Sequence, residues 1–183
     1  MYRSLYFEEV AWTNFDCIGI DHYWAEKIKD KYIDMVKPLF AYGKPVTNTG
    51  FGFSTTTAPA NGVASTLGNV SGLSWILHQQ PVIGRFIRPK LKVIDGRSEA
   101  LQAKRLIDNL KLIDKAGFSG AFMDMFIFPI KPYSDTLKYD IDRESSSLVK
   151  YFEGSRHGTT YPDMTWEPKE AFRAVARYYG GQK

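Results

Sequence analysis

Residues 44–59, KPVTNTGFGFSTTTAP, have the composition of a buried strand that leads into a polar, glycine-broken loop. In an α/β protein the groups that do chemistry usually lie at the C-terminal ends of parallel strands. The strand predicted here, from Pro45 to about Thr49, instead ends in Thr49-Gly50-Phe51-Gly52 and offers no acid, base or thiol. The sequence therefore predicts a strand end in a functional position that lacks a reactive side chain of its own.

Two further apolar segments indicate strands on either side of this one in the sequence, at residues 15–21 and 119–128. Their density of apolar residues is typical of strands in a buried parallel sheet. Two of the three predicted strands lead into segments with helical periodicity, a long loop follows the third, and Ser98 and Gly117 fit the two ends of the longest helix. The expected helices cover residues 25–37, 73–80, 98–117 and 170–179, with the end of an earlier helix at 5–12. Alternating strands and helices predict an α/β fold with parallel strands, in one domain spanning residues 1–183.

Composition narrows the class of protein. With 183 residues, 44% of them hydrophobic and 24% charged, the chain matches a globular protein. The net charge is +4 without a basic run, so we expect no nucleic-acid partner. No apolar run is long enough to span a membrane, so we expect no membrane partner either. The absence of a secretory signal and the single cysteine, Cys17, which we expect to be buried, favour the cytoplasm.

Five stretches resemble one protein family when they are taken together. They are FDCIGIDHYW (15–24), KPLFAYGKPV (37–46), the strand end at 49–52, GAFMDMF (120–126) and YPDMTWEPKEAF (161–172). They resemble the C-terminal half of a glycoside hydrolase-like TIM barrel of the retaining β-glycosidase clan, as found in microbial proteins often labelled "abortive infection protein". The resemblance implies a partial (β/α)8 barrel with about three βα units, which correspond to strands six to eight.

The resemblance also implies which residues form the site. It places a nucleophilic glutamate where this chain has Gly50, and an acid/base on strand four, which these units do not include. Retaining hydrolysis needs two carboxyl groups about 5–5.5 Å apart, so the expected function is a glycosidase-like barrel portion that is catalytically inactive. Asp21 and Asp124 are the alternative candidates for relocated catalytic acids. The implied substrate contacts are His22, Tyr23, Trp24, Asn48 and Phe51.

Two other functions remain open from the residues alone. Three βα units cannot close a barrel and would leave sheet edges unpaired, which favours an interaction or sugar-binding module. Its partners would be a carbohydrate, a second copy of the chain or a complementary barrel half. The other alternative is an active glycosidase that uses relocated carboxylates. No cofactor or metal is expected, and the acidic residues Asp140, Asp142 and Glu144 are interpreted as a solvated loop.

Overall fold

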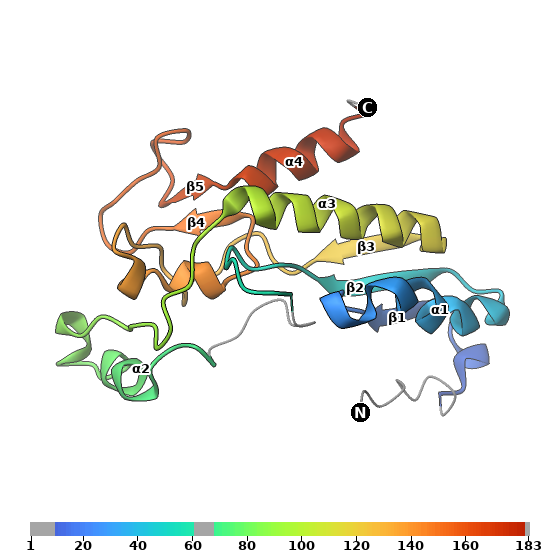
Figure 1. The fold of residues 1–183 in the computed structure, drawn as a ribbon, viewed down its shortest axis with the longest axis horizontal. Coiled ribbons are helices and arrows are strands. Elements are labelled where there is room, and N and C mark those ends of the chain that lie inside the picture. Colours follow the sequence, from blue (N-terminus) through green and yellow to red (C-terminus); the bar gives the residue numbers. More distant parts are fainter. Residues whose placement is uncertain (1–9, 61–67, 182–183) are drawn as a thin grey trace.

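A three-stranded parallel sheet lies at the centre of the computed structural model, which describes residues 10–60 and 68–181. Its strands are β1 (Ile18–Asp21), β2 (Val46–Phe51) and β3 (Gly120–Met123), in the order β1-β2-β3. The central strand β2 places Val46 opposite Ile18 and Thr47 opposite Gly120 (Figure 1). The predicted α/β class and the parallel strands are therefore confirmed.

The third strand is shorter than the predicted segment 119–128. The amide of Asp124 still bonds to the carbonyl oxygen of Phe51, but the chain then leaves β2. The carbonyl oxygens of Met125 and Phe126 accept bonds from the amide of Leu148 instead. The apolar residues after Met123 therefore pair with a later loop, which explains why an apolar run alone overestimates the strand.

The described α-helices are α1 (Tyr32–Val36), α2 (Gly72–His78), α3 (Glu99–Ala116) and α4 (Glu170–Tyr179). The last three lie close to their predicted positions. The segment predicted as one helix at 25–37 is mostly 3₁₀ helix, since η3 (Glu26–Lys31) and η4 (Lys37–Tyr42) flank α1. Of the helix end expected at 5–12, residues 5–9 lie outside the described residues, and a 3₁₀ turn η2 (Trp12–Asn14) follows. The remaining elements are η5 (Gly84–Phe86), η6 (Leu137–Tyr139), η7 (Ile141–Glu144) and an antiparallel pair, β4 (Val149–Tyr151) and β5 (Trp166–Pro168).

Both ends of α3 follow the chemistry predicted for them. The Ser98 hydroxyl accepts a hydrogen bond from the amide of Leu101 at 3.1 Å, which satisfies one of the free donors of the first turn. Gly117 ends the helix in the left-handed region, at φ 87°, where a side chain would be strained. No helix in the described ranges is long and apolar enough to cross a membrane.

Among the described residues, the helices cover one face of the sheet and none covers the other. Ile18 and Ile20 pack against Val36 and Leu39 on the helix side, and Phe51 packs with residues of α3 and α4. The alternate residues point the other way, and Phe122 is 64% exposed there. We name the exposed side, formed by Gly19, Asp21, Thr47, Thr49, Gly120 and Phe122, the open sheet face.

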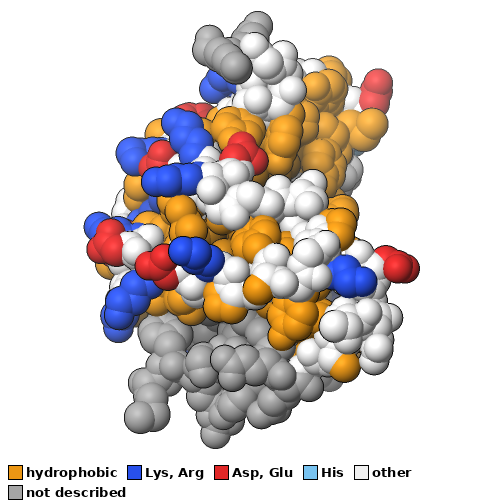
Figure 2. All heavy atoms as spheres, turned by 90° about the vertical axis from the view of Figure 1, so that its right-hand side faces the viewer, with side chains coloured by type: hydrophobic (Ala, Val, Ile, Leu, Met, Phe, Trp, Pro, Cys, Tyr) orange, Lys and Arg blue, Asp and Glu red, His pale blue; other side chains and the backbone are white. Residues whose placement is uncertain are grey.

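Charged and uncharged side chains are unevenly distributed over the surface. Viewed from the strand-start end, charged side chains gather on one side of the molecule, and hydrophobic and uncharged ones dominate the other (Figure 2). Cys17, expected to be buried, is exposed just before β1. The expectation was wrong because the described residues cover one sheet face, so every second residue of an apolar run can remain in contact with solvent.

The acidic residues Asp140, Asp142 and Glu144 are buried, contrary to the expectation of a solvated loop. Asp142 is 1% exposed and its carboxylate lies 3.0 Å from Arg97 and 2.9 Å from Lys169. The same Arg97 contacts Asp140 at 2.8 Å. The interpretation as a solvated loop was wrong because the basic partners come from distant parts of the chain. Burial of charged groups is tolerated when they are paired, as they are here.

A pH-dependent stability follows from Lys131, whose ammonium donates to the carbonyl oxygen of Glu144 at 2.9 Å. Burial lowers the pKa of Lys131 to about 8 from an ordinary value of 10.5, against the opposing effect of nearby acids. Between these values the unfolded state holds more protons, so this residue makes the free energy of unfolding rise with pH. We expect Lys131→Met to remove this rise between about pH 8 and 10.5, measured by urea unfolding across that range.

The matched control is Lys138→Met, since Lys138 is exposed in a neighbouring turn. It should leave the slope of stability against pH unchanged. Equal slopes for the wild-type chain and Lys131→Met would contradict a lowered pKa at this position.

Candidate functional site

The candidate site lies at the C-terminal ends of the three parallel strands. Asp21 ends β1, Gly50 lies opposite it near the end of β2, and Asp124 directly follows β3. The Thr49 hydroxyl donates to the Asp21 carboxylate at 2.7 Å. The Tyr23 hydroxyl donates to the Asp124 carboxylate at 3.4 Å. We name the group Asp21, Tyr23, Gly50 and Asp124 the strand-end site.

A change of strand register shapes this site. The pairing shifts between Ile20 and Asp21 in β1, and between Asn48 and Phe51 in β2. Shifts of this kind redirect side chains and are common beside functional sites. Here Thr49 contacts Asp21 directly, and a Cβ at the next residue, Gly50, would point at Asp21 as well. Two successive residues of one strand are thus directed at the same carboxylate.

Gly50 lies between the side chains of the site and contributes only backbone atoms. A Cβ atom built there would lie 2.9 Å from the Asp21 carboxylate oxygen and 2.9 Å from the Tyr23 hydroxyl. Both of these neighbours are the ends of side chains, which can move aside. A longer side chain at position 50 would therefore project into the space between Asp21 and Tyr23.

The electrostatics of the site keep Tyr23 in its neutral form. Burial raises the pKa of Tyr23 to about 12, and the negative charges of Asp124 and Asp21 add to this effect. The phenol therefore stays protonated near neutral pH and acts as a hydrogen-bond donor. The site presents two carboxylates and a phenol, which can bind hydroxyl groups of a ligand.

Two of the expected substrate contacts, His22 and Asn48, lie behind the sheet. They are 2% and 0% exposed, and the Asn48 amide donates to the carbonyl oxygen of His22 at 3.1 Å and to the Tyr32 hydroxyl at 3.2 Å. The rings of His22 and Tyr32 are 4.3 Å apart, and burial lowers the pKa of His22. These residues join β1 and β2 to α1, and the Asn48 amide oxygen also accepts a hydrogen bond from the backbone amide of Gly50 at 3.2 Å.

Phe51 and Trp24 are also directed away from the strand-end site. Phe51 is 1% exposed and belongs to the core between the sheet and the helices. Trp24 packs edge-on against Phe53, with ring centroids 5.8 Å apart, and lines a groove of about 610 Å³ between η3 and α3. Of the five expected substrate contacts, Tyr23 places its side chain beside Gly50 and Asp124, and Asn48 contacts the Gly50 backbone from the covered side of the sheet.

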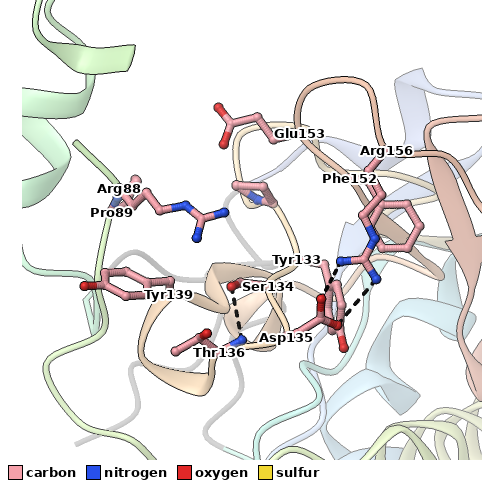
Figure 3. A pocket seen from close by; sticks show the side chains of 11 residues that line it. Arg88, Pro89, Tyr133, Ser134, Asp135, Thr136, Tyr139, Phe152, Glu153 and Arg156 are labelled. Atoms are coloured by element: carbon pink, nitrogen blue, oxygen red, sulfur yellow. Dashed lines mark hydrogen bonds and ion pairs between the residues drawn. The ribbon is translucent and has the colours of Figure 1, made fainter. Parts of the chain in front are cut away.

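A second concave site, which the sequence did not indicate, lies among the loops (Figure 3). It has a volume of about 170 Å³ and is lined by charged and aromatic residues that include Arg88, Tyr139 and Glu153. Asp135 holds the Arg156 guanidinium at 2.7 Å, and that guanidinium lies 4.3 Å from the centre of the Phe152 ring. These residues come from three loops without a recognisable motif, which is why pattern analysis missed the site.

Comparison with known proteins does not extend this description. No protein-family model matches the chain, and no curated protein matches it. Among the residues that the structure describes, no group of three or more His, Cys, Asp or Glu side chains is arranged to hold a metal ion.

The close contacts at Gly50 lead to a stability prediction. In Gly50→Ala the new Cβ would require Asp21 and Tyr23 to move by a few tenths of an ångström. We expect a loss of about 1 kcal/mol in the free energy of unfolding, at the low end for overpacking because the neighbours are side-chain ends. Urea unfolding measures this change.

The matched control is Gly72→Ala at the start of α2, where a Cβ would meet nothing within 4 Å. Alanine is favoured over glycine in a helix, so this variant should be neutral or slightly more stable. An equal effect of the two substitutions would contradict the crowding inferred at Gly50.

Proposed function

We propose that the chain is a glycoside hydrolase-like barrel portion that does not hydrolyse glycosides by itself. The observation that carries the proposal is Gly50, whose missing side chain would point between Asp21 and Tyr23 at the end of a parallel strand. A nucleophilic carboxylate at that position would have a phenol and a second carboxylate beside it. A glycine supplies no atom that could attack an anomeric carbon, so the scaffold lacks the reactive group.

The fold supports the same proposal in a coarser way. Three parallel strands in sequential order, with helices packed on one face, are compatible with consecutive βα units of a (β/α)8 barrel. The open sheet face would then correspond to the interior of the barrel. Its residues Gly19, Thr47 and Gly120 are small, which leaves room for side chains from other strands.

The proposed inactivity can be tested with a panel of aryl glycosides. We expect no release of the aryl group by the wild-type chain above the rate in buffer, because retaining hydrolysis needs a nucleophilic carboxylate and position 50, where the resemblance places it, is a glycine. Turnover by the wild-type chain that disappears in Asp124→Asn or Asp21→Asn would overturn the proposal and favour relocated acids. The matched control is Asp163→Asn, at an exposed aspartate outside the strand-end site.

The open sheet face favours a second function, association with complementary strands. Within residues 10–60 and 68–181, β1 and β3 each pair with β2 alone, so each has one edge without a strand partner. Phe122 is 64% exposed on the adjoining face. Unpaired edges beside exposed aromatic groups are typical of surfaces that add strands from another chain or segment.

Light scattering tests this association. We expect the purified chain to form oligomers, and Phe122→Asp to shift them towards the monomer because it places a charge on the face that would be buried. Phe15→Asp is the matched control, since Phe15 is 52% exposed but lies outside the sheet. A monomeric wild-type chain with a high melting temperature would rule out self-association.

A further inference from the structure

The segment from residue 68 to residue 94 combines exposed apolar and basic side chains. It contains α2, η5 and the loop after them, and it projects away from the sheet and from α3 and α4 (Figure 1). The apolar side chains of Leu73, Ile76, Val82 and Phe86 are each at least 60% exposed. Exposed apolar side chains gathered on one segment indicate an interaction surface.

The charge of this segment has a single sign. Arg85, Arg88, Lys90 and Lys92 are all exposed. The sequence contains no Asp or Glu between Asp34 and Asp95, although the chain has 20 acidic residues. Among the described residues, acidic groups from other elements also reach the segment: Glu144 accepts a hydrogen bond from Asn69, Glu153 lies 3.9 Å from His78, and Asp135 and Glu153 line one pocket with Arg88.

Several of the apolar and basic groups lie beside one another. Leu73 and Leu77 of α2 line a shallow groove of about 420 Å³ together with Phe86, Arg88 and Lys90 from the following loop. The Arg85 guanidinium lies 4.8 Å from the centre of the Phe86 ring. We name this area of residues 72–92 the basic apolar surface.

We propose that the basic apolar surface binds the surface of an anionic lipid bilayer. The apolar side chains would enter the boundary between headgroups and acyl chains, and the basic groups would contact anionic headgroups. A lipid bilayer can take up exposed side chains without preformed pockets. This fits the four apolar residues, each of which is at least 60% exposed. The proposal concerns contact with the bilayer surface, and it departs from the expectation of no membrane partner, which rested on the lack of an apolar run long enough to span the bilayer.

Charge argues against a second copy of the chain as the occupant. An identical copy would bring the same basic surface and a net charge of +4. An acidic protein is the remaining competitor, and it would need pockets for Leu73, Ile76, Val82 and Phe86. The inference is independent of the proposed glycosidase-like function, because it uses none of the strand-end residues.

Sedimentation with vesicles tests the proposal. We expect binding to vesicles of equal parts phosphatidylglycerol and phosphatidylcholine, and little binding to phosphatidylcholine alone. Neutralising two basic groups in Arg85→Gln/Lys90→Gln should weaken binding roughly 25-fold, from about 5-fold for each charge near an anionic surface. Leu73→Ser/Phe86→Ser should weaken binding to the same vesicles at unchanged charge.

Matched controls distinguish binding by this surface from non-specific electrostatic and hydrophobic binding. Lys104→Gln/Lys111→Gln removes two exposed charges from α3, and Phe15→Ser removes an exposed aromatic group before β1. Both should bind anionic vesicles like the wild-type chain, with circular dichroism confirming that every variant is folded. Absence of vesicle binding, or equal loss in the controls, would overturn the proposal. Retention on immobilised polyglutamate without vesicle binding would assign the surface to an acidic protein instead.

Discussion

The second half of the structure depends on the ion pairs that the Asp142 carboxylate makes. It lies 3.0 Å from Arg97 and 2.9 Å from Lys169, and it accepts a hydrogen bond from Ser147 at 3.3 Å. Arg97 immediately precedes the N-cap of α3, Lys169 is the N-cap of α4, and Ser147 leads into β4. One buried side chain therefore fixes the starting points of two helices and a strand. The loss of one partner would leave a buried charge without compensation, which is strongly destabilising.

Strand pairing and a buried polar group position the strand-end site. Pairing of β1, β2 and β3 brings Asp21, Gly50 and Asp124 to one edge of the sheet. The buried group of His22, Asn48 and Tyr32 locks the turn after β1 against α1. The side chains of the site are thus held from behind by satisfied polar contacts, while the open sheet face in front of them has no cover from the described residues.

Local sequence patterns predicted the helices and strands that short-range interactions determine. The N-cap at Ser98, the stop at Gly117 and the apolar stripe between them specify α3, and apolar runs specify the three strands. His22 and Asn48 lie two positions after the buried Ile20 and Val46, so strand alternation places them on the covered face, whereas the family resemblance implied that they contact a substrate. The burial of Asp142 depends on partners 45 and 27 residues away, and the Tyr23–Asp124 contact joins residues 101 positions apart. Contacts over such separations are set by the sheet topology and leave no periodic trace in the sequence.

The exposed thiol of Cys17 gives the chain a practical property. It is the sole cysteine in 183 residues and it directly precedes β1. A maleimide-linked fluorophore would therefore attach at one defined place without any mutagenesis. One edge of β1 pairs with no described strand, and the fluorophore would lie at the start of that edge. Its emission would therefore change when another strand pairs there. The native sequence thus already carries a labelling position for following assembly in real time.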